Sequence, residues 1–376
     1  MKSIFEPRLL QGRARRGREV ALLLALGVAA LVCACGGTGK EPSSAASPGA
    51  SAKQADAPPL FLGAPADYVP AAGLRWLVLA KPKQLLADAR LRKALARLIP
   101  QASLDQYMLS SGVDPARVPQ AAVAGFDYST LYIARVAEED ALIEERFAKR
   151  LLTSKARKHP HPDLWRTTGM IGTTPQTLVR IDRHLVGVSV GDPTPARVVE
   201  AFARRKLKKS PPALEGAALS TLPKEATDAP LVFLAPGPFD GEWIQGAHGL
   251  LAHALAAAIT LRPLTGRNAG VGRFTLYLAG DWKAVGPDST ARLMDAWDEL
   301  STSSTGALFG LDRLTAKPVV SGGDELLKLE IDADLDRLLS GLHAAVAADV
   351  GELMQLDPQP VGPPATPGSP RDSIPE

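Results

Sequence analysis

Thr130-Leu-Tyr-Ile-Ala134 and Thr275-Leu-Tyr-Leu-Ala279 are nearly the same five residues, repeated 145 positions apart. A predicted strand with a similar ending precedes each segment, Trp76-Leu-Val-Leu-Ala80 in one case and Leu231-Val-Phe-Leu-Ala235 in the other. Because several elements recur in the same order at a similar offset, the pattern predicts an internal duplication.

A predicted helix follows each repeated segment, over 138–152 in the first case and 288–300 in the second. The join between the two copies is expected at Lys208-Lys-Ser-Pro-Pro212, where two prolines interrupt a basic run. We therefore expect a first α+β half over 59–212 and a second α+β half over 213–356.

The last part of the second half indicates the fold class. Leu327, Leu329 and Ile331 alternate with charged residues, which is the period-2 pattern of a half-buried strand. The turn Ser321-Gly-Gly-Asp324 before them predicts a hairpin. An apolar stripe at helical spacing then runs from Leu335 to Val350. Strand pairs mixed with helices predict an α+β protein, in which each half is a mainly antiparallel sheet with helices packed on it.

The N-terminus has the three parts of an export signal. Six Lys and Arg residues precede an apolar run from Val20 to Val32, which is too short to span a bilayer. The run ends in Leu31-Val-Cys-Ala-Cys35-Gly36-Gly37. This ending resembles the lipobox of bacterial lipoproteins, with Val32 in the aliphatic place, Ala34 in the small place and Cys35 in the modified place. Cys33 in the variable place departs mildly from that pattern.

The resemblance implies a signal peptide over 1–34 and a lipid attached to the Cys35 thiol, through which the protein binds a membrane. Two or more acyl chains would anchor it stably. The residue directly after Cys35 is glycine and not aspartate. By analogy with lipoprotein sorting, this favours the outer membrane, with the protein facing the periplasm or the cell surface. The Gly/Ser/Ala/Pro-rich stretch 35–58 is expected to be a disordered tether, and the proline-rich stretch 357–376 a disordered tail.

Composition narrows the function. The whole chain has a net charge of +3, but without residues 1–34 it has 37 basic and 38 acidic residues. A nucleic-acid-binding domain should be net basic, so we expect no nucleic-acid partner. Both cysteines lie at or before Cys35, so the exported domain has no disulfide, catalytic thiol or cysteine metal ligand.

Ser189 is the one candidate nucleophile. Gly187-Val-Ser189-Val-Gly191 matches the GxSxG motif of α/β-hydrolases, in which the serine occupies a sharp turn from a strand directly into a helix. Here the strand is predicted to run through Ser189 to Val190, and the helix to begin only near Thr194. The serine is therefore several residues too early, and a strand packed under a helix explains the pattern as well.

Three segments rich in histidine or glycine could suggest a metal or phosphate site, but each is better explained by a structural role. His159-Pro-His161-Pro-Asp163 resembles the start of the HxHxDH metal motif, but position 164 is leucine, so a surface loop is favoured. Gly266–Gly272 separates two strands and predicts a hairpin rather than a phosphate loop. His248 and His253 are expected on an alanine- and leucine-rich helix, on different faces.

Two basic clusters are expected to be solvated helix ends, where cations complement the helix dipole. Their alternative role is contact with anionic lipid or polysaccharide. The first cluster is Arg146, Lys149, Arg150, Lys155, Arg157 and Lys158, and the second is Arg204, Arg205, Lys206, Lys208 and Lys209.

Together these patterns predict a membrane-anchored lipoprotein of the cell envelope with no catalytic residue, metal or cofactor. Its layout and residue usage also resemble uncharacterised lipoproteins of high-GC Gram-negative bacteria, a resemblance that implies no activity. We expect a non-enzymatic binding or scaffold protein, with an envelope protein or a ligand held between the two halves. The alternative is an envelope serine hydrolase that uses Ser189.

Overall fold

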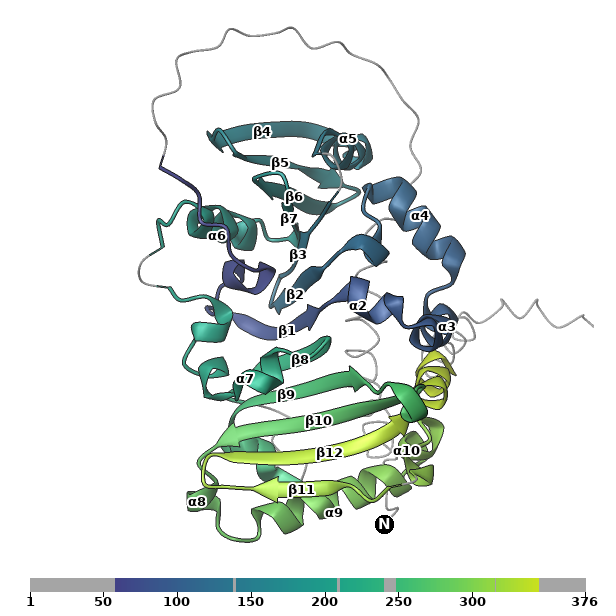
Figure 1. The fold of residues 1–376 in the computed structure, drawn as a ribbon. Coiled ribbons are helices and arrows are strands. Elements are labelled where there is room, and N and C mark those ends of the chain that lie inside the picture. Colours follow the sequence, from purple (N-terminus) through teal and green to yellow (C-terminus); the bar gives the residue numbers. More distant parts are fainter. Residues whose placement is uncertain (1–57, 138–139, 208–209, 240–247, 315, 345–376) are drawn as a thin grey trace, which may run out of the picture.

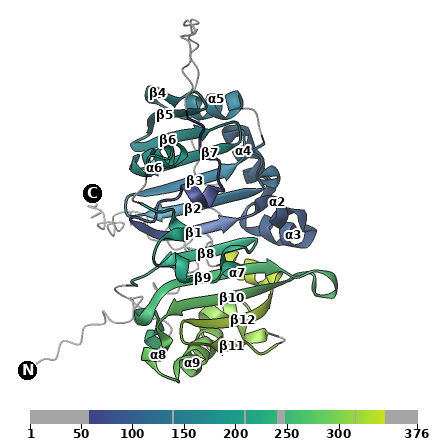
Figure 2. The same cartoon turned by 60° about the vertical axis from the view of Figure 1, so that its left-hand side comes forward.

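The computed structural model of the chain describes residues 58–137, 140–207, 210–239, 248–314 and 316–344. Within these residues, twelve strands form one sheet in which every neighbouring pair is antiparallel (Figures 1 and 2). The sheet order is β11-β12-β10-β9-β8-β1-β2-β3-β7-β6-β5-β4. Helices pack against this sheet, so the expected α+β class is confirmed. Cys35, the signal, the tether and the tail lie outside the described residues.

The strands on one side of the β1–β8 pair all come from the N-terminal part of the chain. They are β1 (Leu74–Ala80), β2 (Gln120–Phe126), β3 (Ser129–Arg135), β4 (Thr153–His161), β5 (Leu164–Ile171), β6 (Thr174–Ile181) and β7 (Leu185–Gly191). The other side contains β8 (Leu231–Pro236), β9 (Ala254–Pro263), β10 (Val271–Gly280), β11 (Val319–Gly322) and β12 (Leu326–Asp334). The expected strands at 76–80, 130–134, 231–235, 275–279 and 327–331 all form.

The two sides are joined by hydrogen bonding between β1 and β8, in which Leu77 pairs with Leu234 and Val78 with Phe233. Leu77 and Leu234 are both fully buried. The sheet therefore continues across the join between the two expected halves.

The two Thr-Leu-Tyr segments do not occupy equivalent positions in this sheet. Successive pairs connect Leu131 through Ala124, Leu77, Leu234 and Ala258 to Tyr277. Directly paired residues point to the same face of an antiparallel sheet, so Leu131 shares its face with Tyr277 and not with Leu276. A shift of one residue in register moves every side chain of a strand to the opposite face. The sequence match between the two segments is therefore not by itself a structural repeat.

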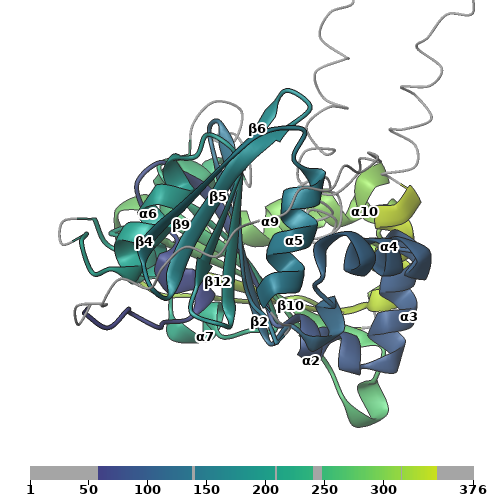
Figure 3. The ribbon, with the colours of Figure 1, turned by 90° about the horizontal axis from the view of Figure 1, so that it is seen from above.

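One face of the sheet, here the α5 face, is covered by α5, α9 and several other helices (Figure 3). On it, α5 (Asp140–Arg150) packs over β6 and β7 through Ile143 and Phe147. Farther along, α9 (Ser289–Thr302) packs over β10 and β12 through Leu293 and Trp297. The helices expected over 138–152 and 288–300 thus form, as Asp140–Arg150 and Ser289–Thr302. Both pack an apolar stripe against the same face of the sheet.

Five further helices of the described residues complete the α5 face. These are α2 (Pro82–Ala87), α3 (Ala89–Leu98), α4 (Gln101–Ser111), α8 (Trp282–Val285) and α10 (Ser304–Leu308). Residues 335–344 are helical, as expected from the stripe that starts at Leu335, and they pack against α3. The remainder of that expected helix, 345–350, lies outside the described residues.

The opposite face, here the α6 face, carries the largest apolar core. Leu77, Leu131 and Val232 lie on it under α6 (Thr194–Ala203), α7 (Lys224–Thr227) and short turns of 3-10 helix, including η1 (Pro65–Tyr68). Tyr68 is fully buried there, and its hydroxyl donates to Phe61 O at 2.6 Å. The strands at the centre of the sheet are thus covered by apolar residues on both faces.

The expectation of a helix around His248 and His253 is wrong. Both residues lie in a 3-10 turn, and Ala254–Pro263 forms β9 at the centre of the sheet. Alanine favours helices locally, but here the alternate residues Ala254, Ala256 and Ala258 are buried. Pairing with β8 and β10 buries them in the sheet, so the tertiary context overrides propensity.

The buried join between β1 and β8 leads to a stability prediction. Leu77→Ala should lower the free energy of unfolding by about 2 to 5 kcal/mol, because it removes fully buried carbon atoms from a packed core. Urea denaturation followed by circular dichroism measures the change. Leu255→Ala, on neighbouring β9 but 53% exposed, is the matched control and should change stability by less than about 0.5 kcal/mol. If the two variants changed the free energy of unfolding equally, the β1–β8 join would not be part of the core.

Candidate functional site

Ser189 lies in the interior of β7 and is fully buried. Its hydroxyl donates to the backbone oxygen of Asp192 at 2.9 Å. The Asp192 carboxylate in turn accepts hydrogen bonds from the amide and hydroxyl of Thr194, which hold its pKa below the ordinary value. Ser189 thus closes the turn between β7 and α6.

The second glycine of the GxSxG motif also has a structural role. Gly191 has a φ of 90°, and a Cβ there would lie 2.3 Å from the backbone oxygen of Tyr128. Only glycine fits such a left-handed position with so close a backbone approach. A nucleophile elbow requires a strained, exposed serine between strand and helix, and the surroundings of Ser189 lack that geometry.

His159-Pro-His161-Pro-Asp163 is not the surface loop that the sequence favoured. It ends the edge strand β4 and enters the turn to β5. The His159 ring lies 6.2 Å from that of Trp165, and His161 Nδ1 accepts a hydrogen bond from the Asp163 amide. Among the described residues, no group of three or more His, Cys, Asp or Glu side chains could hold a metal ion.

The glycine-rich segment is the hairpin connection that the sequence predicted. Gly266–Asn268 forms a short 3-10 turn between β9 and β10. His248, placed on a helix by the sequence, instead lies in the turn before β9, 3.1 Å from the carboxylate of Glu299. None of these segments forms a phosphate-binding site, which needs a helix directly after the glycines.

The basic clusters are largely engaged within the protein. Arg157 pairs with Glu144 at 2.9 Å, Lys149 with Glu145 at 2.9 Å and Arg204 with Glu200 at 3.1 Å. The second cluster follows the end of α6 as expected, with Arg204 as its C-cap. The first cluster ends a helix only in part, because Arg157 and Lys158 lie on the edge strand β4.

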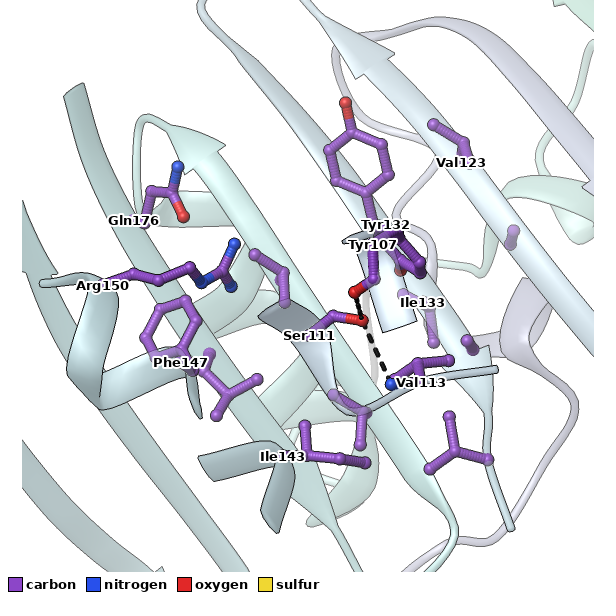
Figure 4. Close-up of a pocket in the computed structure, with 16 residues that line it drawn as sticks. Tyr107, Ser111, Val113, Val123, Tyr132, Ile133, Ile143, Phe147, Arg150 and Gln176 are labelled. Atoms are coloured by element: carbon purple, nitrogen blue, oxygen red, sulfur yellow. Dashed lines mark hydrogen bonds between the residues drawn. The ribbon is translucent and has the colours of Figure 1, made fainter. Parts of the chain in front are cut away.

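The structure reveals a pocket that the sequence did not suggest. It has a volume of about 80 Å³ and lies between the α5 face of the sheet and the helices α4 and α5 (Figure 4). Apolar side chains form most of its wall. Its lining residues are Tyr107, Ser111, Val113, Ala122, Val123, Tyr132, Ile133, Ala134, Val136, Ile143, Phe147, Arg150, Gln176, Leu178, Val186 and Val188.

Two polar side chains, Arg150 and Gln176, stand on the same side of this pocket (Figure 4). Arg150 is the last residue of α5, and its guanidinium lies 5.5 Å from the centre of the Phe147 ring. Gln176 projects from β6 and is 6% exposed. Its Oε1 is buried and has no hydrogen-bond partner among the described residues. A buried amide oxygen without a donor is costly, which marks Gln176 as a candidate ligand contact.

The helix α4 forms one wall of the pocket while burying little of itself. Of its residues only Ser111 is buried, and Met108 and Leu109 are exposed. Ser111 Oγ donates to Tyr107 O and accepts from the Val113 amide, which secures the end of the helix (Figure 4). Arg146 of α5 donates to Met108 O. Polar contacts at the C-terminal end of α4 thus hold this wall of the pocket in place.

A second buried polar residue of β6 lies beyond the pocket. The Arg180 guanidinium stacks 3.8 Å from the centre of the Trp165 ring, its direct cross-strand partner. Burial lowers the pKa of Arg180 to about 10. Such cation–π stacking stabilises a buried guanidinium, and we interpret Arg180 as part of the packing of β5 and β6.

Comparisons with known proteins identify no family. No known protein family and no curated protein sequence matches the chain. Among solved structures, crystal forms III and IV of TP0453 from Treponema pallidum are similar in fold. Form III has a TM-score of 0.44 and 12% identity, covering 75% of this chain and 99% of that one. Form IV has a TM-score of 0.42 and 12% identity, covering 74% and 96%.

The helices of the described residues are too short or too polar to span a membrane.

The role of Ser189 can be tested directly. Ser189→Ala should lower the free energy of unfolding by about 1 kcal/mol, because it removes one hydrogen bond in a buried turn. Hydrolysis of p-nitrophenyl esters should be at background in both the wild type and the variant. Esterase activity in the wild type that disappears in Ser189→Ala, with the fold intact by circular dichroism, would revive the hydrolase hypothesis.

Proposed function

We propose that this chain is a lipid-anchored, non-catalytic binding protein of the bacterial cell envelope, and that it holds a small, mainly apolar ligand in the pocket between α4, α5 and the sheet. The anchor is Cys35, supported by the lipobox-like sequence before it and the tether-like stretch after it. The outer membrane is the proposed location, and no nucleic acid is a partner.

The pocket is the observation that supports a binding role. It combines an apolar wall with two polar side chains on one side, which is the usual composition of small-molecule sites. Catalysis needs a nucleophile or an acid–base pair in geometric reach of a substrate, and Ser189 lies on the opposite, α6 face, in the same row as Leu131. The hydrolase alternative is therefore disfavoured.

The ligand is better placed in this pocket than between the two halves. All lining residues fall within 107–188, inside the expected first half. The halves themselves meet through a hydrogen-bonded strand pair, where Leu77 and Leu234 leave no exposed surface.

We also propose that the two halves are related. The strand order leaving the join is 1-2-3-7-6-5-4 on one side and 8-9-10-12-11 on the other. On each side, a three-stranded meander is followed by a helix on the α5 face, and the last strand returns to pair with the third. Val78 and Phe233, each the third residue of the matched strand endings, are direct partners, as a two-fold axis through the join requires.

Lipidation predicts a clear labelling result. The wild-type chain should incorporate radiolabelled palmitate and sediment with membranes, whereas Cys35→Ala should do neither, because the acyl chains supply the anchor. Cys33→Ala is the matched control and should behave as the wild type. Retained labelling in Cys35→Ala would refute the anchor.

Binding in the pocket is tested with benzene, a small apolar probe. Benzene should raise the thermal unfolding midpoint of the full chain, because a ligand that binds only the native state stabilises it. Ala134→Leu adds three carbon atoms to a pocket-lining position and should abolish the shift. Ala102→Leu, exposed on α4 and outside the lining, is the control and should retain it. Equal shifts in all three proteins, or none, would refute a binding pocket.

A further inference from the structure

We propose that α4 is a lid on the pocket, hinged at Pro100 and Gly112, and that it moves outward to make room for the ligand. This inference rests on the proposed binding function and concerns one wall of the same pocket. With α4 in place, the pocket has a volume of about 80 Å³. A cavity that holds benzene measures roughly 150 Å³, so one wall has to give way before a ligand of that size fits.

Two of the three walls are firmly held. The strands β2, β3, β6 and β7 lie inside the sheet, and each is hydrogen-bonded to a neighbour on both sides. The helix α5 is fixed by Ile143 and Phe147, which are buried in the apolar cluster that it forms over β6 and β7. Moving either wall would break strand hydrogen bonds or expose buried apolar side chains, and both changes are costly.

The third wall, α4, buries little of itself. Tyr107 and Ser111 line the pocket from this helix, and Ser111, its last residue, is the one that is buried. Its first turn has neither a side-chain cap nor an acidic residue to complement the helix dipole. Segments with few buried apolar contacts open at the lowest free energy. α4 is therefore the wall that gives way.

Both ends of α4 suit a hinge. Pro100 precedes the helix with a ψ of 145°, outside the helical region, and Gly112 follows it with a φ of 81°. Glycine adopts this left-handed conformation without strain and can also leave it freely. Hinges are a few residues at the ends of elements that absorb changes in φ and ψ. These two positions let α4 swing as a unit.

The segment before the first hinge does not move with the lid. In Figure 1, α4 lies between α3 and α5. α3 is fixed to the second half of the chain, because Leu91 and Ala94 are buried in one cluster with Leu335. Arg97 of α3 also pairs with Asp336 at 3.0 Å. The movement is therefore confined to α4.

A single exposed contact acts as the latch. Arg146 of the firmly held α5 donates a hydrogen bond to Met108 O, near the C-terminal end of α4. Because this bond is exposed, water can replace it when the lid opens, and the net cost of breaking it is small. The closed lid is thus favoured without being locked.

Hydrogen exchange of the full chain, measured by mass spectrometry, tests the lid. α4 and α5 both have eleven residues, which makes α5 the matched control. An isolated helix of this length is marginal in water, so α4 should lose its hydrogen bonds when it leaves the sheet. Its amides should exchange at least tenfold faster than those of α5. Equal protection of the two helices would overturn the lid.

The latch is tested with benzene, whose binding kinetics can be followed by NMR line shapes. Arg146→Met removes the latch and should speed both association and release of benzene at least threefold, because the lid opens more often. Lys149→Met is the matched control, since Lys149 pairs with Glu145 on α5 itself, and it should leave both rates unchanged.

The outcomes separate this inference from the proposed function. Benzene that binds with the same rates in Arg146→Met and the wild type would refute the lid alone. Failure of benzene to bind, although α4 exchanges fast, would refute the proposed function instead. Should Arg146→Met fail to fold, the comparison of α4 with α5 in the wild type still decides.

Discussion

The pairing of β1 with β8 is the interaction on which the rest of the structure depends. Through it, strands from the two ends of the described chain become one sheet, and Leu77 and Leu234 lie at its centre with no exposed surface. The largest core, on the α6 face, extends across this pair from α6 on one side to Tyr277 on the other. Neither side could bury these residues alone, so each completes the core of the other.

Local patterns predicted most elements that alternate cleanly between buried and exposed positions. The strand at 327–331 and the helices near 140–150 and 289–302 formed where period-2 and helical spacing placed them. β9 was mistaken for a helix because its run of alanines favours a helix locally, and its burial depends on partners far away in the chain. The face on which a strand points its side chains is likewise a property of register, and the match between Thr130–Ala134 and Thr275–Ala279 carries no register information.

The pocket could not be predicted for a related reason. Arg150 was recognised only as one cation in a basic cluster at a helix end, and nothing local distinguishes it from Lys149. Gln176 could have been noticed from the sequence, because it shares a face of β6 with Leu178 and so occupies a position expected to be apolar. Their meeting at one cavity depends on α5 crossing the sheet over β6 and β7, which is long-range geometry. Ser189, by contrast, was correctly placed several residues before its helix from spacing alone.

The open ends of the sheet determine how this protein behaves toward copies of itself. Among the described residues the twelve strands form an open sheet, so its edge strands β4 and β11 each expose a row of backbone donors and acceptors that could recruit another strand. β4 carries Arg157 and Lys158 along its edge, and β11 is only four residues long. Long cationic side chains hinder the pairing of a second β4, and a strand of four residues offers too few hydrogen bonds to hold a partner. At high local concentration, these two edges would keep neighbouring molecules from polymerising into a continuous ribbon.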